Sequence, residues 1–366
     1  MERIKVGIIF GGRSEERDIS LLSARSIVNA IDKSKYEVVP IAISKSGAWL
    51  TSAKSEQLLM ESAASQELSS FEEAPSSSRE LITIDDGVLA TTHQVDVIFP
   101  VLHGPYGEDG TIQGLLELAD VAYVGAGVLG SALGMDKALM KDVFRQRGLP
   151  VPDYQVVMRW QWERNREKVI EEVERRLPYP CFVKPANLGS SIGISKASSR
   201  RELIVAIDEA ARLDRKVLIE QAIDGREIEC SVLGNDEPIA STLGEIIPAR
   251  EFYDYEAKYH DDRTQLIVPA PLPAEITAEI RRLAIEAFLA IDCAGMARVD
   301  FLLERSELRI YVSEINTIPG FTQVSMYPKL WEASGISYSD LIDRLIQLAL
   351  ERHQDKRRNI AQSDSG

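Results

Sequence analysis

The chain has 366 residues, 45% of them hydrophobic, and its 42 Lys and Arg against 57 Asp and Glu give a net charge of −15. A chain of this length buries a large core and divides into two or three domains. The acidic balance, without a long basic run, argues against nucleic acid as a partner. The three cysteines stand singly, so they indicate no disulfide framework. Since no run of about 18 apolar residues occurs, we expect a cytoplasmic protein that binds small molecules and neither nucleic acid nor a membrane.

The N-terminal segment predicts a βαβ unit. An apolar run over residues 4–10, two glycines, a helical pattern over 21–31 and a second strand over 36–43 follow one another. Ligands of such sheets bind at the carboxyl ends of the strands. The glycines do not form G-x-G-x-x-G, so a dinucleotide site is poorly supported. Glu16 lies in the turn and suits an ammonium ligand, with a solvated charged turn as the alternative.

A second crossover follows. A buried strand over 95–102, a helix over 111–118 and a strand over 122–124 predict it. His103 follows the first of these strands and opens a glycine-rich turn, which places it at the same sheet edge as Glu16. A lone histidine is more often structural, but this position makes His103 a candidate for substrate binding.

The middle of the chain holds a glycine-serine loop between two strands. The strand over 179–185 ends near Lys184, the loop covers 186–193, and a strand resumes at 194–196. Such a loop can fold over phosphates as a flap, with an ordinary hairpin loop as the alternative. Lys184 and Lys137 offer cations for phosphate oxygens.

Two further strands lie on either side of a short hinge. They cover residues 217–223 and 225–232 and carry Glu220 and Glu227. This arrangement suits an adenosine, with backbone groups for the base and a carboxylate for the ribose hydroxyls. Residues 51–80, rich in Ser, Glu and Ala, are interpreted as a peripheral insertion without chemistry.

The most informative stretch is a predicted hairpin over residues 296–322. Because residues two apart on a strand share a face, Arg298 and Asp300 point the same way, as do Glu314 and Asn316. If the turn closes with an odd-length loop, both pairs lie on one face of the hairpin.

Oxygen ligands without nearby Cys or His suit Mg²⁺ held together with substrate phosphates. A metal would explain why Glu314 and Asn316 interrupt a face that otherwise includes Ile310 and Val312. The alternative is a solvent-exposed salt bridge between the strands. The Pro-Gly turn at 317–322 can present N–H groups to an anion and favours a ligand site.

In this order, these motifs resemble the D-alanine–D-alanine ligases of the ATP-grasp superfamily. The matching segments, spanning residues from about 10 to 331, are GGRSEERDIS, HGPYGEDGTIQG, MDK, VKPANLGSSIG, FYDYEAKY, ARVDF, EINTIPGFT and SMYPKLW. The resemblance implies a three-domain α/β (α+β) ATP-grasp fold that holds ATP between two antiparallel sheets. The implied parts are a Rossmann-like βαβ domain over 1–128, a central subdomain over 129–222 with the flap 186–193, a C-terminal subdomain over 223–353 with an ω-loop at 250–265 and the metal site, and a polar tail over 354–366.

The resemblance also implies roles for individual residues. Two Mg²⁺ ions, for which Mn²⁺ can substitute, match Asp300, Glu314 and Asn316. ATP matches Lys137, Lys184 and Lys258 at the phosphates, and Glu220, Ala222, Ile223 and Glu227 at the adenosine. The first D-alanine matches Glu16 and His103, and the carboxylate of the second matches Ser325 and Met326. Ser190 and Tyr259 match a pair that links the flap to the ω-loop, and Arg298 with the Gly320 N–H matches the oxyanion stabilisers.

The implied reaction joins two D-alanines with ATP, through a D-alanyl phosphate, for peptidoglycan precursor synthesis. A homodimer follows by analogy, and a monovalent cation requirement is left open. The nearest alternative, a D-alanine–D-lactate ligase, is disfavoured by Tyr259, whereas D-serine as second substrate is harder to exclude. Another ATP-grasp ligase and a catalytically silent nucleotide-binding module are the remaining alternatives. Gln221-Ala222 departs from a Lys-Trp pair seen in some members, but backbone contacts survive this change.

Overall fold

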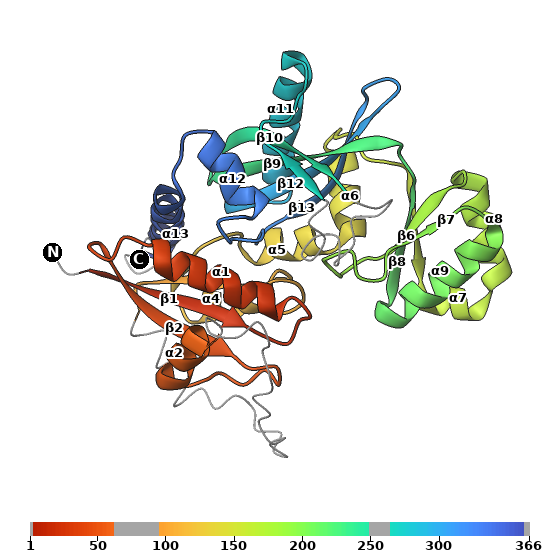
Figure 1. The fold of residues 1–366 in the computed structure, drawn as a ribbon. Coiled ribbons are helices and arrows are strands. Elements are labelled where there is room, and N and C mark those ends of the chain that lie inside the picture. Colours follow the sequence, from red (N-terminus) through yellow and green to blue (C-terminus); the bar gives the residue numbers. More distant parts are fainter. Residues whose placement is uncertain (1–2, 62–94, 249–263, 362–366) are drawn as a thin grey trace.

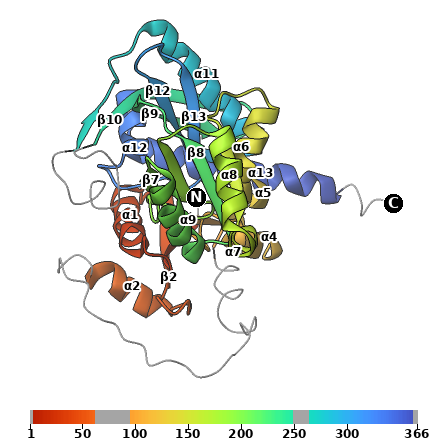
Figure 2. The ribbon, with the colours of Figure 1, turned by 90° about the vertical axis from the view of Figure 1, so that its right-hand side faces the viewer.

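The structure, a computed structural model, describes residues 3–61, 95–248 and 264–361. They form three sheets, each covered by helices (Figures 1 and 2). The strands are β1 Ile4–Gly11, β2 Tyr36–Ile43, β3 Val97–Val101, β4 Ala122–Tyr123, β5 Tyr154–Met158, β6 Cys181–Pro185, β7 Ser195–Ala197, β8 Lys216–Gln221, β9 Gly225–Gly234, β10 Ile239–Ile247, β11 Gln265–Ile267, β12 Gly295–Glu304 and β13 Ile310–Asn316. The helices are α1 Arg17–Ala30, α2 Ser52–Glu61, α4 Thr111–Leu118, α5 Val128–Met135, α6 Lys137–Gln146, α7 Arg159–Arg164, α8 Arg166–Arg176, α9 Arg200–Leu213, α11 Ala274–Ala290, α12 Met326–Ala333 and α13 Tyr338–Ala361.

The N-terminal sheet is parallel, with the strand order β2-β1-β3-β4. Helices α1 and α13 pack on one face and α4 on the other, so the strands are buried on both sides. Burial on both faces explains why β1 and β3 are continuous apolar runs. The parallel arrangement places the turns after β1 and β3, which carry Glu16 and His103, at the same edge, as predicted.

The C-terminal sheet is antiparallel, with the order β11-β10-β9-β12-β13. Helix α11 covers the face of this sheet that carries the core residues Ile228, Val299 and Phe301. The sequence-based division at residue 129 assigned α5 and α6 to the central subdomain. Met140 and Phe144 of α6 pack instead in the core of the C-terminal sheet, because α6 is apolar on the side that faces α11.

The central sheet has the order β5-β8-β6-β7 and is covered by α8 and α9. In Figure 1 this part of the chain, drawn in green, extends away from the N-terminal domain. Ser199 caps α9 by accepting the Glu202 N–H at 3.4 Å. Residues 186–194 connect β6 and β7, so the flap joins two strands as predicted.

The hairpin of β12 and β13 contains a β-bulge that strand alternation did not predict. Asp300 is paired with Glu314, but Phe301 is paired with Val312, so Ser313 is an extra residue. Beyond the bulge the side chains of β13 change faces. Val312 is therefore buried in the core opposite Phe301, and the prediction that it shares a face with Glu314 is wrong. The pairs of Arg298 with Asn316 and of Asp300 with Glu314 do lie on one face.

Two segments that the sequence marked as peripheral are ordered helices in part. Helix α2 begins the Ser/Glu-rich segment and packs against β2, where Ser55 Oγ accepts the Ala42 N–H at 3.0 Å. Helix α13 continues to Ala361, through most of the segment interpreted as a polar tail, and its apolar side packs on the N-terminal sheet. Among the helices that the structure describes, none is both long and apolar enough to span a membrane.

Candidate active site

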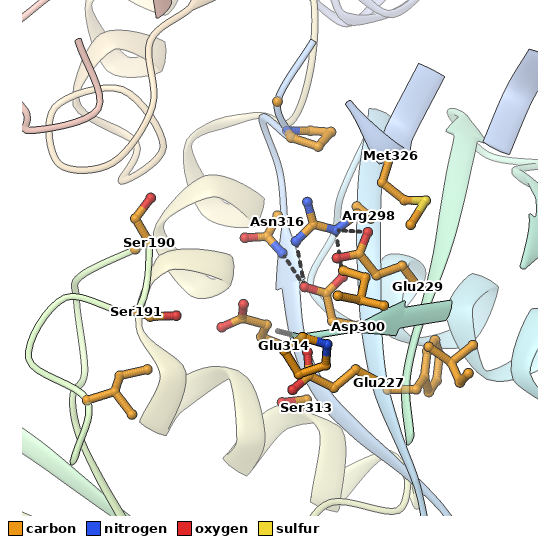
Figure 3. Close-up of a pocket in the computed structure, with 18 of the residues that line it drawn as sticks. Ser190, Ser191, Glu227, Glu229, Arg298, Asp300, Ser313, Glu314, Asn316 and Met326 are labelled. Atoms are coloured by element: carbon orange, nitrogen blue, oxygen red, sulfur yellow. Dashed lines mark hydrogen bonds and ion pairs between the residues drawn. The ribbon is translucent and has the colours of Figure 1, made fainter. Parts of the chain in front are cut away.

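A cleft with a volume of about 1750 Å³ is lined by residues of the central and C-terminal sheets, by α1 and the turns after β1 and β3, and by the flap (Figure 3). The predicted site residues that line it are Glu16, His103, Lys184, Ser190, Glu220, Ala222, Ile223, Glu227, Arg298, Asp300, Glu314, Asn316, Gly320, Ser325 and Met326. Lys137 lines a smaller cavity of about 50 Å³ that shares Ser190, Glu314 and Asn316 with the cleft. Lys258, Tyr259 and most of the predicted ω-loop lie outside the described residues.

Arg298 is the centre of a buried ionic cluster on β12. Its Nε and Nη2 atoms each lie 2.7 Å from one oxygen of Asp300, and Nε also lies 3.1 Å from Glu229 Oε2. Burial lowers the pKa of the guanidinium, but the carboxylates of Asp300 and Glu229 outweigh burial and raise the pKa well above its usual value. Arg298 is only 7% exposed, so the alternative of a solvent-exposed salt bridge does not apply.

Beside this cluster lie the oxygens proposed as metal ligands. The Nδ2–H of Asn316 donates a hydrogen bond to Asp300 Oδ2 at 3.0 Å. Glu314 Oε2 lies 3.6 Å from Lys137 Nζ. No group of three His, Cys, Asp or Glu side chains that could hold a metal occurs in the part of the chain that the structure describes. Two carboxylates and an amide oxygen therefore fit Mg²⁺ only together with further oxygens, which substrate phosphates would provide.

Glu220 is buried between two lysines. Its Oε1 lies 2.5 Å from Lys141 Nζ and its Oε2 lies 2.5 Å from Lys184 Nζ. Burial raises the pKa of this carboxyl, but the two ammonium groups outweigh burial and hold the pKa below its usual value. Both carboxylate oxygens of Glu220 are engaged, and Glu220 is only 1% exposed. Glu227 is therefore better placed than Glu220 to meet a ribose.

The hinge after β8 lies at the wall of the cleft. Ala222 donates its N–H to Pro180 O at 3.3 Å, so the N–H of this residue is already used within the fold. Ile223 follows it and also lines the cleft. The Ile223 backbone is therefore the candidate for the predicted contact with an adenine ring.

The N-terminal domain and the flap meet at Glu16. Ser190 Oγ donates a hydrogen bond to Glu16 Oε1, and both Ser190 and Ser191 adopt left-handed backbone conformations, with φ of 50° and 57°. Figure 3 shows both serines on the opposite side of the pocket from the ionic cluster. The second carboxylate oxygen of Glu16 lies close to the backbone of Gly104. Only a glycine leaves room for it, since a Cβ at position 104 would lie 2.8 Å from Glu16 Oε2. The flap is therefore held to the carboxylate that was expected to bind an ammonium group.

The loop between β13 and α12 forms the remaining wall. Ser325 precedes α12, and its Oγ accepts the Thr322 N–H at 3.1 Å. Met326 packs against Ile246 and Leu330 and also lines the cleft. Gly320 lies in the same loop, close to Ser325.

Comparison with known proteins identifies the family. The model for the D-ala D-ala ligase N-terminus matches residues 5–126, and that for the C-terminus matches residues 143–347. A relative from Chloroherpeton thalassium named D-alanine--D-alanine ligase is 51% identical over 368 residues, which covers 98% of this chain and 99% of the relative. The chain belongs to the D-alanine–D-alanine ligase family. Another family member, from Heliobacterium modesticaldum, is 52% identical over 360 residues and 98% of each chain.

Solved structures of D-alanine ligases have the same fold. The structure of the D-alanine-D-alanine ligase from Coxiella burnetii matches with a TM-score of 0.81 and 36% identity, and the match covers 100% of this chain and 99% of that one. The VanG D-Ala:D-Ser ligase from Enterococcus faecalis matches with a TM-score of 0.79 and 34% identity, over 95% of this chain and 100% of that one. The predicted family and the predicted α/β ATP-grasp fold are confirmed.

Among the ionisable residues at or beside the described site of this D-alanine–D-alanine ligase family member, Lys141, Glu229 and Glu108 were missed in the sequence. Lys141 lies one helical turn after Lys137, a spacing that could have revealed it. Glu229 lies two residues after Glu227 on β9 and therefore shares its face. Glu108 lies in the turn that His103 opens and accepts the Gly104 N–H at 2.7 Å.

Proposed function

We propose that this family member joins two D-alanines to D-alanyl-D-alanine, with ATP converted to ADP and phosphate, as a step in peptidoglycan precursor synthesis. The observation that carries the proposal is that one cleft is lined by the flap, by Glu16 and by the polar residues of the β12–β13 hairpin, which are Arg298, Asp300, Glu314 and Asn316. Identity of about one half to relatives named D-alanine--D-alanine ligase, over nearly the whole chain, supports it.

The first step activates a carboxylate, which is a poor electrophile. The carboxylate of the first D-alanine attacks the γ-phosphorus of ATP, the bond to the β-phosphate oxygen breaks, and a D-alanyl phosphate and ADP form. Glu16 binds the ammonium group of this substrate. Lys137 and Lys184 neutralise charge on the phosphates, and the flap excludes water that would hydrolyse the acyl phosphate.

The second step forms the peptide bond. The amine of the second D-alanine attacks the acyl carbon, phosphate leaves with its bridging oxygen, and the amine releases a proton. Arg298 uses Nε and Nη2 for Asp300, so its Nη1 and the Gly320 N–H are assigned to the oxyanion. Removing one such donor typically costs about 10²–10³-fold in kcat.

Asp300, Glu314 and Asn316 would hold the two Mg²⁺ ions, or Mn²⁺ in their place. Such ions supply charge neutralisation at the transferring phosphoryl group.

Lys258 is assigned to the γ-phosphate, and Tyr259 to the contact between ω-loop and flap. Glu227 with Ala222 and Ile223 is assigned to the adenosine, His103 to the first substrate, and Ser325 and Met326 to the carboxylate of the second. Whether a monovalent cation contributes is a matter for titration with K⁺ and Na⁺.

The remaining assignments concern the protein as a whole. We place the reaction in the cytoplasm, where ATP is available, and infer a homodimer. Helices α4 and α5 expose Leu118 by 89%, Leu129 by 55% and Val128 by 42%, and a contact between subunits would remove such apolar side chains from water. Light scattering of the purified protein tests the homodimer.

D-serine is the second candidate for the second substrate, because the VanG D-Ala:D-Ser ligase shares the fold. The deciding experiment measures phosphate release from ATP with D-alanine alone and with D-alanine plus D-serine or D-lactate, and identifies the products by mass. D-Alanyl-D-alanine as the main product supports the proposal, and a mixed product changes only the specificity. No D-alanine-dependent phosphate release would refute it.

A further inference from the structure

The bulge at Ser313 determines which way Glu314 points. On β12, Asp300 faces the cleft and Phe301 faces the core. In an unbroken β13, Glu314 would lie on the same face as Val312, which is buried in the core. The extra residue at position 313 reverses the alternation and brings Glu314 opposite Asp300. Figure 3 shows Ser313 and Glu314 at this point of the pocket.

The backbone of the bulge is bonded to a buried lysine. Lys141 Nζ donates to the carbonyl oxygen of Ser313 at 2.8 Å, across 172 positions of sequence. A bulge interrupts the hydrogen-bond ladder of its strand, and a buried carbonyl without a donor costs free energy. Lys141 thus supplies a donor at the point where β13 departs from regular pairing.

The burial of Lys141 requires an explanation. Its side chain is 1% exposed, and lysine is almost never fully buried unless it is paired. Glu220, at 2.5 Å, neutralises it. The same Glu220 binds Lys184, so one carboxylate joins Lys141 to a lysine of the phosphate site. Lys141 therefore links the strand β8, which leads to the hinge, with the strand that carries Glu314.

We propose that Lys141 is a positioning residue that stabilises the bulge at Ser313 and thereby keeps Glu314 turned toward the cleft. The proposal rests on the proposed function insofar as Glu314 is a metal ligand there. Groups that orient a ligand without touching the metal typically change metal affinity by about 10–100-fold when they are removed. The competing explanation is that Lys141 only neutralises Glu220 and has no effect on β13.

A double-mutant cycle separates the two explanations. The variants are Lys141→Met, Glu220→Gln and the combination of both. In the combined variant, the uncharged glutamine at position 220 no longer needs Lys141 as a counter-ion. The carbonyl oxygen of Ser313 still lacks its donor. This variant is therefore expected to fold even where Lys141→Met alone unfolds.

The first measurement is hydrogen exchange of the backbone amides of residues 313–316 in the ligand-free chain. The second is Mn²⁺ binding in the presence of a non-hydrolysable ATP analogue, followed by electron paramagnetic resonance. We expect the combined variant to exchange these amides faster than Glu220→Gln and to bind Mn²⁺ about 10–100-fold more weakly than Glu220→Gln does. Lys141→Arg keeps the positive charge and the hydrogen-bond donors. This variant is expected to keep most of the Mn²⁺ affinity of the unmodified chain.

Equal exchange and equal Mn²⁺ affinity in Glu220→Gln and the combined variant would overturn the proposal, because Lys141 would then act only on Glu220. The exchange experiment needs no substrate or metal. Its outcome is therefore separate from a failure of the proposed function, which would appear as an absence of D-alanine-dependent phosphate release in the unmodified chain.

Discussion

The Nδ1 atom of His103 lies 2.9 Å from the carbonyl oxygen of Ile318, a residue 215 positions away. Glu108, from the same turn as His103, accepts the Ile318 N–H at 3.2 Å. Both backbone groups of Ile318 are thus held by the turn after β3. Because Gly320 lies two residues further on, the N-terminal domain fixes the loop that is assigned to the oxyanion.

Replacing His103 should therefore reduce turnover more than ATP binding. In His103→Ala the loop loses one of its two attachments, and a misplacement of about 1 Å can cost about 10²-fold in rate. Steady-state phosphate release gives kcat, and calorimetry gives the dissociation constant of ATP. The matched control is His353→Ala on α13, whose imidazole is 3.7 Å from Asp120, a residue at the amino ends of the parallel strands and so at the opposite edge of the sheet from His103. An unchanged kcat in His103→Ala would show that Glu108 alone holds the loop.

Glu108 should make the protein less stable as the pH rises. Burial, and then the neighbouring Glu16 carboxylate, raise the pKa of Glu108 from 4.5 to about 8. Between these values the folded chain holds a proton that the unfolded chain has released, so the free energy of unfolding falls with rising pH across this window. Denaturant unfolding of the wild type and of Glu108→Gln at several pH values measures the difference. The decline between pH 4.5 and 8 should be shallower in Glu108→Gln, and identical slopes would contradict the pKa shift.

The alternation of β12 was sufficient to predict the face shared by Arg298 and Asp300, because side-chain direction on a regular strand is a local property. The same rule failed on β13. The bulge at Ser313 depends on Lys141 of a distant helix, and no pattern within 310–316 reveals that contact.

The burial of Glu220 between two lysines was equally inaccessible from the sequence. Only the packing of α6 against the sheets brings Lys141 to β8. The roles proposed for individual residues came from the motifs, whereas the ion pairs that orient these residues come from tertiary contacts.

Gly244 should influence the binding of the second substrate through Met326. A Cβ at position 244 would lie 2.7 Å from Met326 Sδ and 3.0 Å from Leu330 Cδ2, so Gly244→Ala must displace the flexible methionine from the cleft wall. We expect a higher KM for the second D-alanine with little change in the KM for ATP, measured by varying each substrate.

The matched control is Gly114→Ala in α4, where a Cβ meets nothing within 4 Å. It should leave the kinetics unchanged and stabilise the helix by about 0.5–1 kcal/mol. If Gly244→Ala changes no Michaelis constant, Met326 does not form part of the second-substrate site.

Arg298→Ala should abolish ligation and leave ATP binding nearly intact, because the guanidinium is assigned to the oxyanion and not to the nucleotide. The structure adds a second consequence. Asp300 and Glu229 would lose their shared cation, and breaking a buried ion pair typically destabilises by about 3–5 kcal/mol. Product analysis by mass, ATP calorimetry and thermal unfolding of the same preparation are therefore all needed.

Glu229→Gln separates the two consequences. It removes one carboxylate but keeps the two contacts of Arg298 with Asp300 at 2.7 Å, so the oxyanion donor stays in place. Combined with Arg298→Ala, it leaves one fewer unpaired carboxylate and should recover part of the lost stability, without recovering ligation. Folded protein that binds ATP but makes no dipeptide would assign the loss to the missing guanidinium. Near-normal turnover in either variant that lacks Arg298 would remove this residue from the oxyanion site and leave the Gly320 N–H as the remaining donor.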